Sequence, residues 1–128
     1  MWTVAKVQDT DVLRDVLDQW RAGVDAHQPQ RVAAVFTEDA IFQGLRPFSV
    51  GPDGVAKYYD SQPLGMSVTY RILETRRPTE ELIVGYVCAD FTFPDRATVS
   101  LNLGVLITHG CAGWRILHYQ ASPAVQLS

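Results

Sequence analysis

The sequence has little cysteine and no long apolar run. Its two cysteines, Cys88 and Cys111, stand far apart without a C-x-x-C spacing or a nearby histidine pair, so we expect buried thiols. No window approaches the roughly 18 apolar residues that a membrane span needs. The first residues, "MWTVAKVQDTD", lack the positive and apolar segments of a secretory signal. We therefore expect a cytoplasmic protein with no membrane partner.

The sequence also lacks a basic run and a set of metal ligands. Lysine and arginine total 11 against 14 aspartates and glutamates, a net charge of −3, so no nucleic-acid partner is expected. The three histidines show neither i, i+4 nor H-x-H spacing, which predicts no metal site. What is present suits a soluble globular protein, with 47% hydrophobic and 20% charged residues. We expect one domain over residues 1–128, because a folded chain of this length buries roughly two-thirds of its unfolded surface.

Apolar residues at helical spacing predict three helices in the first half of the chain. In residues 10–27 apolar side chains recur every three or four positions, as on one face of a helix, and Thr10 is the expected N-cap. A second, short helix is expected to start at Pro29. A third is expected to start at Pro52 and to end before Pro63.

The second half reads as strands separated by turn residues. Residues 38–45 give a short first strand. Four longer β-rich runs follow, over residues 67–76, 82–93, 97–108 and 114–123. Turns this short favour an antiparallel meander. Helices first and an antiparallel sheet afterwards predict an α+β fold without internal repeats.

The run 97–108 carries information about both faces of the sheet. Leu101, Leu103, Val105 and Ile107 make one face wholly apolar, while the other face is half apolar and half polar. A sheet covered by helices on one side should keep one wet face. We therefore expect a second subunit on the other side, and predict a homodimer through the sheet.

Two short motifs stand out within this order of elements. One is the F-x-x-D-A element of Phe36, Asp39 and Ala40, and the other is the W-R-I-x-H-x-x-x-S element that begins at Trp114. Over about residues 9–123 the chain resembles the nuclear-transport-factor-2-like superfamily, in its SnoaL-like branch related to the association domain of calmodulin-dependent kinase II. The resemblance implies a cone-shaped, strongly curved antiparallel sheet with helices closing one end around a pocket. It also implies a dimer.

The resemblance does not choose an activity, because superfamily members include ketosteroid isomerases, polyketide cyclases, epoxide hydrolases and non-catalytic proteins. Alignment with the isomerases places Trp20 at their oxyanion-hole tyrosine and Gly44 at their general-base aspartate. An indole does not replace that phenol, and a glycine abstracts no proton, so steroid-isomerase chemistry is excluded. The epoxide-hydrolase pattern is incomplete, because Arg71 and Asp90 have no second carboxylate on the last strand to join them.

Polar residues on the strands are the candidates for chemistry. His118 can act as an acid or base in a desolvated cavity, or it can be a packed histidine bonded to a neighbouring element. Asp90 and Arg71 are expected on adjacent strands, either as a buried pair that activates water or as an exposed ion pair of little energetic weight. Gln120 and Asn102 can fix a ligand carbonyl or hydroxyl, or they can bond to each other or to water.

Aromatic side chains are numerous for a small domain, and several facing inward would line a pocket. Core packing is the alternative for any single one of them. Those assigned to ligand contact are Trp20, Phe42, Tyr58, Tyr86 and Trp114, with Tyr59 in the same group. Together they favour a fairly flat, hydrophobic ligand.

Strand parity divides the last run, 114–123, into two faces. Trp114, Ile116, His118 and Gln120 are predicted to face the cavity, while Leu117 and Tyr119 are predicted to face the partner subunit.

Two functions fit these residues. The first is a cofactor-independent accessory enzyme of bacterial polyketide-like secondary metabolism, of cyclase, isomerase or hydrolase type. In it His118 or Asp90 is the general base, and Tyr58, Gln120 or Asn102 polarises a carbonyl. The alternative is a non-catalytic ligand-binding or assembly domain with the same pocket. The expected partners are a small hydrophobic molecule and a second copy of the chain.

Overall fold

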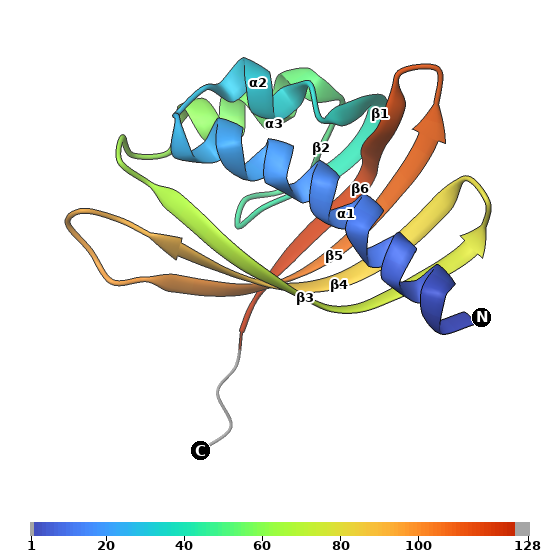
Figure 1. Ribbon diagram of the computed structural model, residues 1–128. Helices are drawn as coiled ribbons and strands as arrows, with labels where there is room; N and C mark the ends of the chain where they lie inside the picture. The colour runs from blue at the N-terminus through green and yellow to red at the C-terminus, as the bar shows by residue number, and fades with distance from the viewer. Residues whose placement is uncertain (1, 125–128) are drawn as a thin grey trace.

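The chain folds into helices and one curved sheet, seen in a computed structural model that describes residues 2–124, with side chains from residue 8 onward. The elements are α1 (Trp2–Asp25), α2 (Pro29–Ala33), β1 (Phe36–Gln43), β2 (Ser49–Val50), α3 (Pro52–Asp60), β3 (Ser67–Thr79), β4 (Leu82–Thr92), β5 (Val99–Gly110) and β6 (Gly113–Pro123). Figure 1 shows the helices lying within the curve of the sheet, with α1 crossing it and α2 and α3 at one end. The α+β expectation is confirmed.

The six-stranded sheet has the order β2-β1-β6-β5-β4-β3. From β3 to β6 it is the expected antiparallel meander. The first long strand, β1, pairs in parallel with β6, the last, and β2 adds a short antiparallel edge to β1. The sequence did not predict either feature, because neither strand carries a mark of its partner.

The long helix α1 covers the sheet through the stripe of apolar residues that predicted it. Leu13, Leu17 and Trp20 are fully buried, and Leu13 lies so near β4 that a side chain at Gly85 would approach its Cδ2 atom to 2.3 Å. The expected N-cap at Thr10 is wrong, because the helix begins at Trp2. The sequence before Thr10 contains no proline or glycine that would stop a helix.

The end of α1 is fixed close to the predicted residue. His27 follows the helix with a positive φ of 50°, the left-handed conformation that ends many helices. Just before it, a carboxylate oxygen of Asp25 accepts a hydrogen bond of 2.9 Å from the backbone N–H of Val68 on β3. This bond ties the helix end to the edge strand.

The inner face of the sheet is the apolar face predicted for the run 97–108. Leu101, Leu103, Val105 and Ile107 are all buried on β5. They join the helix stripe in one hydrophobic core. Burial of this kind is the main source of stability for a domain of this size.

The last strand departs from regular alternation at one residue. In the pairing of β5 with β6, Ile107 lies opposite Ile116 and Leu106 opposite His118, so Leu117 is an extra residue. Such a bulge moves every later side chain to the other face. Ile116 and Tyr119 are both buried as a result. The predicted orientation of this strand is therefore correct before Leu117 and wrong after it.

The outer face of the sheet is half apolar, as the sequence predicted. Val84 is 40% exposed and Tyr86 is 48% exposed on β4, and Ile41 on β1 is 43% exposed. The second subunit expected on this face stays a prediction.

Within residues 2–124, no helix is long and apolar enough to cross a membrane.

Candidate ligand-binding pocket

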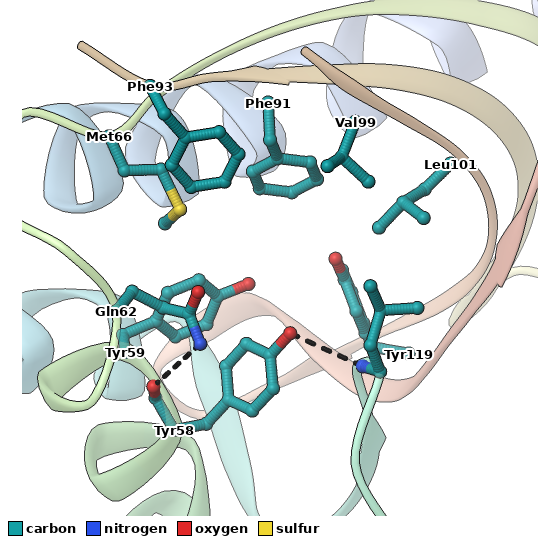
Figure 2. A pocket seen from close by; sticks show the side chains of 10 residues that line it. Tyr58, Tyr59, Gln62, Met66, Phe91, Phe93, Val99, Leu101 and Tyr119 are labelled. Atoms are coloured by element: carbon teal, nitrogen blue, oxygen red, sulfur yellow. Dashed lines mark hydrogen bonds between the residues drawn. The ribbon is translucent and has the colours of Figure 1, made fainter. Parts of the chain in front are cut away.

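Three tyrosines from two elements surround a small pocket at one end of the cone. Tyr58 and Tyr59 come from α3, and Tyr119 comes from β6 (Figure 2). The pocket has a volume of about 50 Å³. The other side chains around it are mostly apolar: Leu45, Gln62, Met66, Phe91, Phe93, Val99 and Leu101.

Local sequence explains how α3 delivers two adjacent tyrosines to this place. Gly51 adopts a φ of 89° just before the helix, a conformation that favours glycine, and Pro52 then starts the helix with its fixed φ. Adjacent residues on a helix point about 100° apart. Tyr59 is accordingly buried in the core, while Tyr58 is only partly buried at its edge.

The hydroxyl of Tyr59 is held by the core. The indole Nε1–H of Trp20 donates a buried hydrogen bond of 3.0 Å to it. The hydroxyl of Tyr119 interacts with it as well. Figure 2 shows the hydroxyls of Tyr59 and Tyr119 pointing into the open middle of the pocket. Each of the two hydroxyls carries one proton, and when one hydroxyl donates to the other, the second proton is left for an acceptor in the pocket.

Burial keeps these phenols protonated. Desolvation raises the pKa of Tyr59 and of Tyr119 well above the ordinary tyrosine value. The interactions with Trp20 and Tyr119 lower the pKa of Tyr59, but by less than desolvation raises it. Both groups are therefore neutral hydrogen-bond donors at every physiological pH. A neutral donor in an apolar pocket stabilises a neutral acceptor most, since a buried charge without a partner is costly.

Tyr58 occupies the position that a side chain at residue 44 would take. A Cβ atom at Gly44 would lie 2.4 Å from Cζ of Tyr58 and 2.5 Å from its hydroxyl. The hydroxyl accepts a hydrogen bond of 3.3 Å from the backbone N–H of Leu45. The absence of a side chain at Gly44 thus leaves room for the ring of Tyr58.

The residues that line the pocket include no carboxylate, imidazole, amine or thiol. General-base catalysis needs a group that takes up a proton near neutral pH, and the lining offers none. Among the described residues, no three His, Cys, Asp or Glu side chains gather as metal ligands. The chemistry open to this pocket is hydrogen-bond donation to a neutral molecule packed among aromatic rings.

The predicted polar residues of the last strands lie on the outer face instead. His118 and Gln120 are 3.4 Å apart between ring Nε2 and amide Oε1, and Gln120 is exposed. Their predicted orientation into the cavity is wrong, because the bulge at Leu117 reverses the strand after it. Asn102 lies on the same outer face and accepts a long hydrogen bond of 3.7 Å from Sγ of Cys88. That thiol is partly buried and that of Cys111 is exposed, so neither cysteine is buried as predicted.

Asp90 and Arg71 lie on adjacent strands as predicted, but both are exposed on the outer face. Asp90 accepts a hydrogen bond of 2.6 Å from Ser100. The hypothesis that Asp90 and Arg71 form a buried pair is therefore wrong, and neither side chain lines the pocket.

The aromatic candidates divide into three groups. Tyr58 lines the pocket as predicted. Trp20 and Phe42 are core residues that support it, Trp20 through its bond to Tyr59 and Phe42 by stacking on Tyr119 at 4.9 Å. Two others do not contribute: Tyr86 is exposed on the outer face, and Trp114 lies at the far end, beneath the guanidinium of Arg77.

Sequence reasoning missed Tyr119 as a pocket residue. It also missed the apolar residues at the tip of β4 and β5, Phe91, Phe93 and Val99. One signal was present: Ile116 and Leu117 are consecutive apolar residues in an otherwise alternating strand, which is where alternation can slip by one position.

Comparison with known proteins identifies the fold. No protein-family model and no curated protein matches the sequence. Among solved structures, a domain of unknown function with a cystatin-like fold from Nostoc punctiforme superimposes with a TM-score of 0.81 at 19% identity, over 94% of this chain and 80% of that one. A ketosteroid isomerase-like protein from Erwinia carotovora gives 0.77 at 19% identity, over 91% and 96% of the two chains.

A third similar structure is an NTF-2-like protein of unknown function from Shewanella oneidensis, with a TM-score of 0.76 at 15% identity over 88% of this chain and 98% of that one. The nuclear-transport-factor-2-like fold expected from the two motifs is thereby confirmed. At these identities the similarity is one of fold, and the activity has to be argued from the pocket.

Proposed function

We propose that this protein binds a small organic molecule whose part inside the pocket is neutral, largely apolar and carries a hydrogen-bond acceptor. The observation that carries the proposal is the pair of hydroxyls of Tyr59 and Tyr119 in an apolar pocket, where Tyr59 already accepts a bond from Trp20, so that the pair has a proton left to donate. A carbonyl oxygen is the acceptor that fits best, because it accepts a hydrogen bond from a phenol hydroxyl and carries no net charge. The apolar lining binds the rest of the molecule.

The catalytic alternative is an isomerase, cyclase or hydrolase of polyketide-like metabolism, acting without a cofactor. A phenol that polarises a carbonyl supports it, while the absence of a base from the pocket lining and the volume of about 50 Å³ favour binding alone. We therefore place binding first and carbonyl polarisation by Tyr59 second.

The proposal includes a homodimer in the cytoplasm that associates through the outer face of the sheet. The apolar groups exposed there, Ile41, Val84 and Tyr86, support it. A sheet face of this composition is stabilised when a second copy covers it.

The ligand proposal is tested with two probes of the same shape, cyclohexanone and methylenecyclohexane. They are titrated into isotopically labelled protein, and the backbone amide shifts are followed by NMR. We expect shift changes at Tyr59, Phe91, Leu101 and Tyr119, and tighter binding of the ketone. Tyr59→Phe should reduce that preference by about two- to tenfold, the value of one hydrogen bond.

Tyr70→Phe is the matched control, since the hydroxyl of Tyr70 donates to the carboxylate of Asp18 and to the backbone oxygen of Arg14, both on α1 and outside the pocket. It should leave the preference for the ketone unchanged. If neither probe shifts the pocket amides, the proposed function is wrong. If both bind equally to the wild-type protein, Tyr59 is not the donor.

A further inference from the structure

The ring of Tyr58 is a wall shared by two cavities. On one side lies the pocket just described. On the other lies a cleft of about 230 Å³ beside the β1–β2 loop, lined by Phe42, Arg46, Pro47, Ser49, Gly54, Lys57 and Tyr58. Any molecule that reached from one space to the other would have to displace this ring.

Few contacts hold the side chain of Tyr58 in its position between the two cavities. Its hydroxyl accepts one hydrogen bond of 3.3 Å from the loop residue Leu45. Its ring packs edge-on against Phe42 and against Tyr59, with ring centroids 5.1 Å apart in each pair, and it is only partly buried. Gly44, which has no side chain, leaves the space in which the ring rests. Turning the ring outward costs one partly exposed hydrogen bond and these ring contacts.

The two cavities differ in charge. The inner pocket has no charged lining residue, while Arg46 and Lys57 both line the outer cleft. Within residues 8–124 neither cation forms an ion pair. The nearest acidic side chains on the same helix, Asp53 and Asp60, line a separate cleft together with Lys57. The outer cleft therefore presents positive charge beside the apolar wall.

The volumes indicate that a ligand needs both spaces. Sites for small organic molecules commonly measure about 300–1,000 Å³, whereas the inner pocket measures about 50 Å³. It holds an apolar group but not a whole ligand. The outer cleft, at about 230 Å³, supplies the missing volume.

We propose that the natural ligand is an amphiphilic organic anion whose apolar end fills the inner pocket and whose anionic group lies between Arg46 and Lys57, with Tyr58 turned aside between them. This inference rests on the proposed function and names the ligand class of the same site. The anionic group remains solvated at the exposed cations, so the free-energy cost of its desolvation is small. Only the neutral, apolar end of the ligand enters the inner pocket.

The test compares two probes that differ in one group, phenylbutanoate and phenylbutanol. Both carry a phenyl ring on the same chain, and the first ends in a carboxylate. Isothermal titration calorimetry of the wild-type protein should show tighter binding of the carboxylate. Arg46→Gln and Lys57→Gln should each weaken phenylbutanoate by about two- to fivefold and leave phenylbutanol unchanged.

Arg71→Gln is the charge-matched control, because Arg71 is exposed on the outer face of the sheet. It should not alter either affinity. The preference for the carboxylate should fall as salt is added, since exposed charges are screened. All three arginine or lysine variants change exposed side chains, so they should fold as the wild type does.

Tyr58→Ala tests the wall itself. Removing the ring joins the two cavities, and we expect tighter binding of both probes, with circular dichroism confirming the fold. Equal affinities of the two probes for the wild-type protein, or unchanged affinity in both cation variants, would overturn the inference and leave the proposed function standing. Binding of neither probe would overturn the inference, and the cyclohexanone titration would then decide the proposed function separately.

Discussion

At the scale of the residue, the pocket depends on phenols that stay protonated. Tyr59 and Tyr119 are buried side by side, and burial raises the pKa of each. A group whose pKa is raised by folding stabilises the folded state below its ordinary pKa and loses that contribution as the pH rises. The relevant window therefore begins near pH 10, the ordinary value for tyrosine.

We predict that the free energy of unfolding falls above about pH 10, by about 1.4 kcal/mol per pH unit for each of these two tyrosines. The cause is that the unfolded chain loses protons there and the folded chain does not. Urea unfolding at several alkaline pH values measures it. Tyr119→Phe keeps the ring and should lower the measured slope by about 1.4 kcal/mol per pH unit, whereas an unchanged slope would mean that Tyr119 is not buried as a neutral phenol.

Gly44 gives a second prediction at this scale. Gly44→Ala brings a methyl group within 2.4 Å of the Tyr58 ring, so the ring has to leave its position. We expect a loss of about 1–3 kcal/mol in stability, as for other overpacked sites, measured by thermal unfolding. Gly110→Ala is the control, because a Cβ atom there meets nothing within 4 Å. Equal losses of stability in the two variants would mean that the ring of Tyr58 does not occupy the space beside Gly44.

At the scale of the element, the sequence predicted helices and strands well wherever one periodicity ran without a break. The stripe of Leu13, Leu17 and Trp20 located α1 and its buried face. The alternation from Leu101 to Ile107 located the inner face of β5. Both are local patterns, and local patterns are what a single sequence carries.

The sequence failed where a single residue or a distant partner decided the geometry. Leu117 shifts the register of β6, and nothing in its chemistry distinguishes it from its neighbour Ile116. Because of this one extra residue, His118 and Gln120 lie on the outer face of the sheet and Tyr119 lines the pocket. The pairing of β1 with β6 was missed because it joins segments far apart in the chain.

The bulge can be tested by deletion. Without Leu117, Ile116 and Tyr119 fall two positions apart on a regular strand and keep the same face. We expect the deletion to fold with a loss of about 1–3 kcal/mol, measured by circular dichroism during heating. Deleting Asn102 from the regular strand β5 should prevent folding, because it turns the core side chains beyond it outward. If the two deletions behave alike, Leu117 is not a bulge.

At the scale of the whole molecule, the question is what lies on the outer face of the sheet. The helices lie within the curve of the sheet, so this face is free in one chain. Val84 and Tyr86 lie on β4, the strand beside the edge strand β3. Tyr86 pairs with Gly104 of β5, where a Cβ atom would meet nothing within 4 Å. An exposed ring beside a position without a side chain suits a self-complementary contact.

We predict that the protein is a dimer and that Tyr86→Arg makes it a monomer, because a buried arginine without a partner opposes association. Light scattering after size-exclusion chromatography measures both. Leu64→Arg is the control, since Leu64 is 74% exposed in the segment between α3 and β3. A wild-type monomer, or a dimer that survives Tyr86→Arg, would contradict association through this face.

The parallel pairing of β1 with β6 also determines when, during synthesis of the chain, the sheet can be completed. During synthesis β1 emerges before the other strands, but its hydrogen-bonding partner β6 is made after all of them, so the sheet cannot close until β6 is available. Contacts between such distant segments slow folding. Phe36 and Phe42, which end against Tyr119, stay exposed in the meantime. The nascent chain is therefore most open to aggregation, and most in need of a chaperone, just before its last strand is added.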